Sequence, residues 1–322
     1  MKKALFSGCQ LNNKDIQLLL QHGVEIKKVP GDLSEEKIIK ELQDCNFYII
    51  GGADKASKKV IESTKLELIV FWGTGYENYV DVKAADVKGI PVANTPKANA
   101  YTVAEHAVAL ILDAVKQTTY LNNTTKQGQW LRRQTWNLED KTLGIVGLGT
   151  IGGHVARIMH RAFKMQILYI SRSKKENLEK ELGAKKVDLE TLMSLADVIS
   201  IHASYSEETA QMIGEKQLSK VKPQAVLVCT SRAELVEPTA LKKALVNNKL
   251  ATAAFDSYYK EPAPLAKDDP WGLLSLPDNK FIITPHTAYG SKEAVENMNS
   301  MVIENIITFL KSGNPKYLVN LS

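Results

Sequence analysis

Four side chains that can exchange protons or bind anions follow strand-like segments in the last third of the sequence. Arg232 follows one apolar run, Asp256 follows the next with Glu261 close behind, and His286 follows a third. Each of these residues alone is equally typical of a surface, a cap or a turn. Because parallel strands end at a common edge of a sheet, where α/β proteins bind ligands, we expect the four to share one site.

Reduction of a 2-keto acid is one chemistry that these residue types can serve. Arg232 can grip a carboxylate through its planar fork of N–H groups. His286 can protonate a carbonyl oxygen, since imidazoles exchange protons near neutral pH. A carboxylate such as Glu261 would favour the imidazolium and orient the ring. The reaction also needs a hydride donor, which a nicotinamide cofactor supplies.

A glycine-rich turn provides the place for such a cofactor. Gly147, Gly149 and Gly152 stand in a G-x-G-x-x-G pattern between an apolar run and a helical pattern. The first glycine permits a tight turn, the second lets a pyrophosphate approach the backbone, and the third allows close helix–strand packing. The helix that starts at Thr150 and Ile151 directs unpaired N–H groups at the phosphates. The alternative is a simple strand-to-helix turn; we favour dinucleotide binding.

The segment after the next predicted strand favours NADP over NAD. NAD-selective folds usually place an acidic residue there, to bind the ribose 2′-hydroxyl. This sequence has Ser171, Arg172 and Ser173 instead, followed by two lysines. A guanidinium and two hydroxyls suit a 2′-phosphate. The alternative is a solvated basic loop.

Short apolar runs alternate with helical patterns twice along the chain, which predicts parallel sheets covered by helices. The expected strands of the first series are residues 4–6, 24–26, 47–50, 68–71 and 90–92. Those of the second series are 143–146, 167–170, 198–201, 225–228, 251–255 and 281–283. The expected helices are 35–42, 82–87, 101–119, 151–162 and 292–310, with a polar connection over 122–134. A chain of 322 residues is also long enough for two domains.

Composition excludes several other classes of protein. The net charge of +5 is mild, and no dense basic block suggests nucleic acid. Three scattered cysteines indicate neither a disulfide framework nor a zinc site, so we expect no metal and a reducing, cytoplasmic setting. No apolar run approaches the roughly 18 residues that a membrane span needs.

At the level of motifs, the chain resembles the D-isomer-specific 2-hydroxyacid dehydrogenase family along nearly its whole length. The glycine turn is one match. The others are Gly73-Thr74-Gly75-Tyr76 with Asn78 and Asp81; Asn94-Thr95-Pro96 with Asn99; Val103-Ala104-Glu105-His106; Thr230-Ser231-Arg232; Phe255-Asp256 with Glu261-Pro262; and Thr284-Pro285-His286. Several motifs in order are far more specific than any one of them.

The resemblance implies a role for each matching residue. Arg232 is expected to bind the substrate, Glu261 and His286 to form the acid/base pair, and Asp256 to lie near the nicotinamide carboxamide. In the substrate domain, Thr74, Gly75 and Asn99 are expected to bind the substrate's carboxylate end. Further residues are expected to line the cofactor cleft: His202, Ala203, Cys229, Thr230 and Ser231.

The family's fold implies two doubly wound parallel-sheet α/β domains. A Rossmann cofactor domain, residues 100–287, is expected to be inserted in a flavodoxin-like substrate domain formed by residues 1–99 and 288–322. The resemblance also implies a homodimer with paired cofactor domains, and a small anionic 2-keto or 2-hydroxy acid as substrate. The turn at Arg172 resembles NADPH-using members such as glyoxylate/hydroxypyruvate reductases.

The sequence departs from the family pattern in three places and leaves one rival function open. Ala233 and Lys97 stand where the family usually has glycine, and His202-Ala203-Ser204 replaces His-x-Pro. We expect His106, on an apolar helix face, to be structural. Trp72 and Tyr101 are candidates for shaping the substrate pocket, with core packing the expected role of at least one of them. The rival is a cofactor-sensing binding protein like the dehydrogenase-related corepressors, which retain the same Arg, Glu and His.

Overall fold

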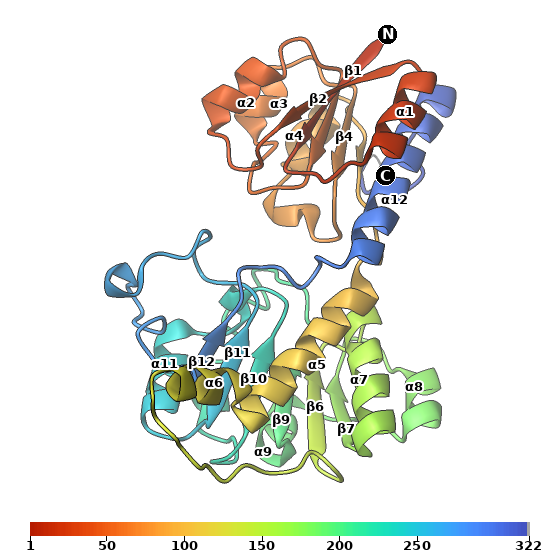
Figure 1. The fold of residues 1–322 in the computed structure, drawn as a ribbon. Coiled ribbons are helices and arrows are strands. Elements are labelled where there is room, and N and C mark those ends of the chain that lie inside the picture. Colours follow the sequence, from red (N-terminus) through yellow and green to blue (C-terminus); the bar gives the residue numbers. More distant parts are fainter. Residues whose placement is uncertain (321–322) are drawn as a thin grey trace. The chain divides into compact units, whose positions relative to one another are not determined.

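Two sheets of parallel strands organise the chain in a computed structural model that describes residues 1–320 (Figure 1). The chain divides into two compact units. Unit 1 comprises Met1–Asn99 and Gly290–Ser322, and unit 2 comprises Ala100–Tyr289. The return to unit 1 thus falls two residues later than the predicted boundary at residue 288.

Unit 1 is built on a five-stranded sheet in the order β2-β1-β3-β4-β5, all parallel. This is the flavodoxin-like strand order. Its strands are β1 (Lys2–Ser7), β2 (Val24–Val29), β3 (Phe47–Ile50), β4 (Leu68–Phe71) and β5 (Val92–Ala93). Its helices are α1 (Asn13–Gln21), α2 (Glu35–Glu41), α3 (Lys58–Glu62), the 3-10 turn η1 (Tyr76–Asn78), α4 (Val82–Val87) and α12 (Lys292–Ser312).

Unit 2 is built on a seven-stranded sheet in the order β12-β11-β10-β9-β6-β7-β8, also all parallel. Counted from its own first strand, the first six strands lie in the Rossmann order 3-2-1-4-5-6, with β12 added at the edge. Its strands are β6 (Thr142–Val146), β7 (Gln166–Ile170), β8 (Lys185–Lys186), β9 (Val198–Ile201), β10 (Val226–Cys229), β11 (Thr252–Phe255) and β12 (Phe281–Ile283).

Helices cover this second sheet, and α5 packs on β10, β11 and α7. The helices of unit 2 are α5 (Ala100–Lys116), α6 (Thr118–Lys126), α7 (Thr150–Phe163), α8 (Glu176–Leu182), α9 (Leu189–Leu195), α10 (Glu215–Leu218) and α11 (Pro238–Val246), with 3-10 turns η2 (Ala233–Leu235) and η3 (Ala266–Asp268). Every residue of β9, β10 and β11 is buried, as strands covered on both faces require. The predicted fold class, two doubly wound parallel α/β domains, is confirmed.

The predicted polar connection over residues 122–134 was wrong in its first part, because α6 continues to Lys126. The predicted helix over 101–119 also ends early, at Lys116, because Gln117 adopts a left-handed conformation with φ of 56°. The carboxylate of Asp113 then accepts hydrogen bonds from Thr118 and Thr119. A local side-chain cap therefore starts a new helix inside a segment whose polarity suggested a loop.

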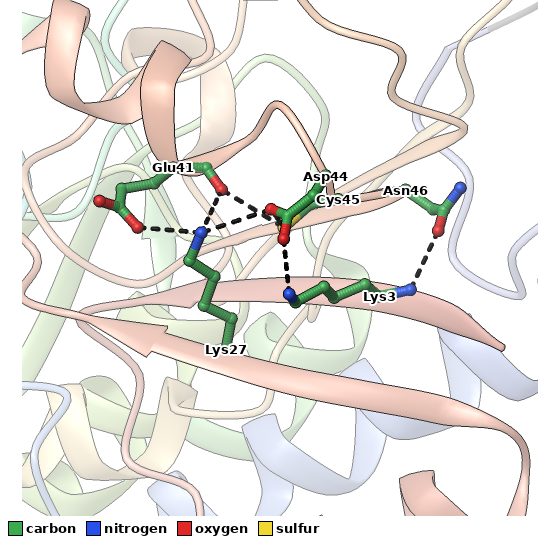
Figure 2. A network of polar contacts seen from close by, with 6 residues as sticks. All are labelled: Lys3, Lys27, Glu41, Asp44, Cys45 and Asn46. Atoms are coloured by element: carbon green, nitrogen blue, oxygen red, sulfur yellow. Dashed lines mark hydrogen bonds and ion pairs between the residues drawn. The ribbon is translucent and has the colours of Figure 1, made fainter.

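An ion-pair network ties the first two strands of unit 1 to the connection between α2 and β3 (Figure 2). Lys3 Nζ lies 2.6 Å from Asp44 Oδ2, and Lys27 Nζ lies 3.4 Å from Asp44 Oδ1 and 3.0 Å from Glu41 Oε2. The hydrogen bond from Lys3, joined by the hydrogen bond and charge of Lys27, lowers the pKa of Asp44 to about 2 against the effect of desolvation. Because these charges face solvent, the network adds only modest stability.

None of the three cysteines forms a disulfide. Burial raises the pKa of all three thiols, to about 11 for Cys45 and about 12 for Cys229, and higher still for Cys9. Each is therefore protonated, and chemically inert, at neutral pH.

Candidate active site

Three neighbouring strands of unit 2 bring Arg232, Asp256 and His286 to the same edge of the sheet. Strands β10, β11 and β12 run parallel, with Cys229 paired to Phe255 and Phe255 paired to Ile283. The three polar residues follow the carboxyl ends of these strands, which is the ligand-binding edge in doubly wound sheets. Their common location within one unit follows directly from the strand order.

Glu261 and His286 form a hydrogen-bonded pair although 25 residues separate them. His286 Nδ1 lies 2.9 Å from Glu261 Oε2, and the backbone N–H of Tyr258 donates to Glu261 Oε1 at 3.2 Å. Desolvation by itself would raise the pKa of Glu261. The hydrogen bond and charge of His286, the Tyr258 N–H and the charge of Arg232 outweigh it and hold that pKa below its usual range. Glu261 is therefore an anion that orients the ring through Nδ1, and Nε2 is the second nitrogen of that ring.

Arg232 stands in the turn between β10 and η2, where it is half-buried. Its backbone is extended, with φ of −102° and ψ of 133°. Ser257, which follows Asp256, donates to the carbonyl of Ser231 at 2.9 Å and so ties this turn to the end of β11. The next residue, Ala233, is helical and fully buried, so alanine satisfies a position where glycine was expected.

Asp256 lies at the end of β11 and is only 1% exposed. Its carboxylate accepts hydrogen bonds from the Thr284 hydroxyl at 2.6 Å and from the backbone N–H groups of Thr287 at 3.0 Å and Ala288 at 2.8 Å. Burial favours the neutral acid, but these bonds and one from His106 outweigh it and lower the pKa of Asp256. The carboxylate is thus engaged by protein groups, and its expected position beside a nicotinamide stays a prediction.

The glycine turn lies between β6 and α7, and its three glycines differ in what surrounds them. Gly147 has φ of 100°, and a Cβ there would meet the backbone of Ala203 at 2.5 Å. A Cβ on Gly152 would meet the carbonyl oxygen of Gly147 at 2.5 Å. A Cβ on Gly149 would meet no atom within 4 Å among the described residues. The first and third glycines are therefore required by packing, whereas the second leaves open space over the start of α7.

That open space fits a dinucleotide pyrophosphate. Gly149 is the N-cap residue of α7, so the first N–H groups of a 14-residue helix, including those of Thr150 and Ile151, begin beside it. Helix N-termini bind phosphate through such N–H groups and through their partial positive charge. When bound, a nicotinamide dinucleotide supplies the hydride that this chain's own side chains lack.

Ser171, Arg172 and Ser173 form the turn after β7, and Arg172 and Ser173 are exposed. Two lysines hold the turn: Lys175 Nζ donates to Ser173 Oγ at 3.1 Å, and Lys186 Nζ donates to the Arg172 carbonyl at 3.3 Å. The turn therefore presents a guanidinium and hydroxyls in a basic setting.

Below this turn, the buried hydroxyl of Tyr169 accepts the Lys175 N–H at 2.9 Å and donates to Glu179 at 2.8 Å. Glu179 also pairs with Lys174 at 3.3 Å. Glu179 thus lies on α8 and contacts Tyr169 and Lys174. The turn itself, residues 171–173, has no acidic side chain.

The ends of β9 and β10 are joined through His202. Its Nε2 lies 2.8 Å from Ser200 Oγ, and its Nδ1 lies 3.4 Å from Thr230 Oγ1. Loss of hydration lowers its pKa to about 4, so the ring is neutral at physiological pH. His202 and Thr230, with Ala203 and Ser231 beside them, therefore form an uncharged stretch of the same sheet edge.

The residues expected to bind the substrate carboxylate from the other domain lie in unit 1. Thr74 is exposed, and Gly75 and Asn99 are half-buried. The Asn94 amide donates to the Thr74 carbonyl at 3.0 Å, and Thr95 N–H donates to the Gly73 carbonyl at 2.9 Å, which fixes the turn. The substrate-binding role of these residues stays a prediction.

Trp72 and Tyr101, the candidates for shaping a substrate pocket of which at least one was expected to pack in the core, differ in exposure. Trp72 is 4% exposed, and its Nε1 donates to Asn299 on α12 at 2.8 Å, so it packs in the core of unit 1. Tyr101 is 55% exposed at the start of α5. Lys97 is exposed with φ of 64°, a conformation that favours the glycine expected at its position.

The sequence reasoning missed the part played by His106. Its Nε2 lies 3.1 Å from Thr284 Oγ1 and 3.4 Å from Asp256 Oδ1, beside the loop that carries His286. The available signal was Thr284 itself, which stands two residues before His286, directly after an expected strand.

Two negative findings concern residues 1–320. No described helix is both long enough and apolar enough to cross a bilayer. Within the same residues, no group of three or more His, Cys, Asp and Glu side chains is arranged to hold a metal ion.

Comparison with known proteins identifies the family. A family model described as "D-isomer specific 2-hydroxyacid dehydrogenase, NAD binding domain" matches residues 108–288. A glyoxylate reductase of Korarchaeum cryptofilum is 35% identical over 328 aligned positions, which cover 99% of this chain and 96% of the relative. This relative therefore spans both units.

Solved structures agree with this result. The structure of an acyclic imino acid reductase in complex with NADPH and D-Arg has a TM-score of 0.86 at 28% identity, covering 99% of this chain and 100% of that one. D-lactate dehydrogenase from Aquifex aeolicus, complexed with NAD and lactic acid, has a TM-score of 0.83 at 27% identity with the same coverage. The chain belongs to the D-isomer-specific 2-hydroxyacid dehydrogenase family.

Proposed function

We propose that this protein reduces a small 2-keto acid to the D-2-hydroxy acid, reversibly, with NADPH as the preferred hydride donor. The observation that carries the proposal is the 2.9 Å contact between His286 and Glu261 on the unit that also holds the glycine turn. Unit 2 is then the cofactor domain and unit 1 the substrate domain. The glyoxylate reductase relative supports a short, anionic substrate.

Arg232, His286 and Glu261 have distinct roles in this proposal. Arg232 binds the substrate carboxylate and polarises the carbonyl. His286, oriented by Glu261 through Nδ1, donates a proton from Nε2 to the carbonyl oxygen as that oxygen gains negative charge. In the oxidation direction the same nitrogen accepts the hydroxyl proton.

The test is a substrate panel of glyoxylate, hydroxypyruvate, pyruvate and longer 2-keto acids with NADPH and NADH. Turnover of at least one acid, with the D-2-hydroxy product identified by chiral chromatography, is expected. Tight cofactor binding without turnover of any acid would instead favour a cofactor-sensing protein. Absence of both binding and turnover would contradict both functions.

Replacing Arg172 by serine should lower the ratio of kcat/KM for NADPH to kcat/KM for NADH by at least about tenfold. The reason is that hydrogen bonds to a charged group contribute roughly 1.5–3 kcal/mol, and only NADPH carries the 2′-phosphate. Lys249→Ser, which removes an exposed positive charge after α11, is the matched control and should leave the ratio unchanged. A wild-type enzyme with a clear NADH preference would contradict the assignment.

We further propose that the protein is a homodimer paired through its cofactor domains. The segment after α6 carries two exposed apolar side chains, Trp130 at 79% and Leu131 at 42% exposure, which a partner would cover. Light scattering should then give about twice the chain mass of 35.6 kDa. A mass equal to one chain would contradict the dimer. We also propose a reducing, cytoplasmic location, because three scattered cysteines without paired spacing are typical of such a compartment.

A further inference from the structure

We propose that His106 is a positioning residue for His286, acting through Thr284 and Asp256. The inference rests on the proposed function, because it assigns His106 a purpose in the reaction that His286 performs. His106 itself lies on α5 and is placed to contact the loop after β12, not the reacting atoms. Its effect on catalysis is therefore indirect.

The direction of the hydrogen bonds identifies His106 as a donor. Thr284 has a single hydroxyl proton, and its shortest contact, 2.6 Å, is with Asp256 Oδ1. The hydroxyl oxygen must then accept from His106 Nε2, 3.1 Å away. The same Nε2–H also lies 3.4 Å from Asp256 Oδ1. His106 thus carries its proton on Nε2 and donates toward both oxygens.

Asp256 connects this donor to the loop that carries His286. Its carboxylate accepts from Thr284, two residues before His286, and from the backbone N–H groups of Thr287 and Ala288 directly after it. The loop is therefore held on both sides of His286 by one buried anion. A nearly buried carboxylate needs every such donor, because an unpaired buried charge is costly.

The backbone of His286 explains why the loop needs this support. His286 has φ of 50°, in the left-handed region that non-glycine residues rarely adopt. Its own N–H donates to the Thr284 carbonyl at 2.9 Å. A conformation of this kind persists only where its surroundings fix it. Releasing Thr284 would let the loop relax and move the imidazole away from Glu261 and from the substrate.

The position of α5 makes His106 a rigid anchor. Its helix runs from Ala100 to Lys116 and packs on β10 and β11, the strands that lead to Arg232 and Asp256. Because α5 is packed against the sheet, His106 gives the loop after β12 a fixed point of attachment. The position of His286 is thereby fixed by the sheet and α5 as well as by the loop that carries it.

The experiment compares His106→Leu, which removes the donor, with His106→Gln, whose amide restores an N–H near Nε2. His106→Leu should lower kcat about tenfold or more, because small displacements of a reacting group cost up to about 10²-fold. The Kd for NADPH should change less than about twofold, and His106→Gln should recover part of the lost kcat. The matched control is His160→Leu. His160 lies on α7, is partly buried, and its Nδ1 lies 2.9 Å from the Met165 carbonyl oxygen. This variant should keep kcat within about twofold of the wild-type value.

Two further readouts separate positioning from general loss of structure. In a His286→Ala background, His106→Leu should have almost no effect on the residual rate, since its target is gone. Hydrogen exchange at the Thr287 and Ala288 amides should quicken at least about tenfold in His106→Leu and stay near the wild-type rate in His160→Leu. Equal effects of His106→Leu with and without His286, or unchanged exchange of these amides, would overturn the inference.

The exchange measurement needs no substrate, so it also separates the two proposals. A wild-type protein that reduces no 2-keto acid would refute the proposed function. Fast exchange of the two amides in His106→Leu would still support the anchor in that case, and slow exchange would refute it. Activity lost in His286→Ala but retained in His106→Leu would refute the anchor alone.

Discussion

Replacing His286 by alanine should lower kcat for 2-keto acid reduction by about 10²–10⁴-fold, the range that positioned acid/base groups contribute. The Kd for NADPH should change less than about twofold, because the glycine turn and the Arg172 turn belong to other strands of the sheet. Steady-state assays that follow NADPH fluorescence report kcat, and calorimetric titration reports Kd.

The matched control for this prediction is His160→Ala, which removes another partly buried imidazole from unit 2. Its kcat should stay close to the wild-type value. Both variants should show near-wild-type circular dichroism, so that a loss in His286→Ala cannot arise from unfolding. A His286→Ala enzyme with full activity would refute the acid/base role.

The pH dependence tests the partner of His286. The pKa of Glu261 is lowered, so its negative charge persists at and below neutral pH and is lost only as the pH falls through that lowered value. Glu261→Gln removes the charge at every pH. Because the charged carboxylate orients the His286 ring at Nδ1, wild-type kcat/KM for reduction should fall as the pH drops through the lowered pKa of Glu261. Glu261→Gln should have a lower kcat/KM and should lack this fall on the acid side.

The sequence predicted those parts of the fold that depend on local pattern. Buried parallel strands read as continuous apolar runs, so β9, β10 and β11 were found within one residue or two. The helices α1 and α3 were not predicted, although α2 and α4, which bury only one residue each, were. The break at Gln117 depends on a cap by Asp113, which a helical pattern does not reveal.

The candidate site was predictable for a different reason. Arg232, Asp256 and His286 each follow a strand, and strand order in a doubly wound sheet makes their neighbourhood a consequence of topology. The contact between Glu261 and His286 was inferred from chemistry and resemblance, and its geometry became visible only in the structure.

The hydrogen bonds of the loop after β12 were not predictable. They involve the backbone N–H groups of Thr287 and Ala288, which carry no sequence signal. His106 looked structural for a different reason: its 3.1 Å contact with Thr284 depends on how α5 packs in the folded unit. Side-chain chemistry is readable from sequence, whereas backbone donors are not.

Replacing Arg232 by alanine should lower kcat/KM for 2-keto acids by about 10²–10³-fold, mainly through KM. Two charge-assisted hydrogen bonds from one guanidinium to a carboxylate, at roughly 1.5–3 kcal/mol each, account for an effect of this size. Loss of the Arg232 charge also removes one of the influences that lower the pKa of Glu261, so a smaller fall in kcat should accompany the rise in KM.

The decisive comparison uses a 2-keto acid and the corresponding 2-keto amide, such as pyruvate and pyruvamide. Wild-type enzyme should strongly prefer the acid, because only the acid gives Arg232 a charged, two-oxygen partner. Arg232→Ala should lose most of that preference, since the amide never had the interaction to lose. Arg232→Lys keeps the charge without the planar fork and should fall between the two. A preference for the acid that survives unchanged in Arg232→Ala would place carboxylate recognition on other residues, and Thr74 and Gly75 of unit 1 would be the next to replace.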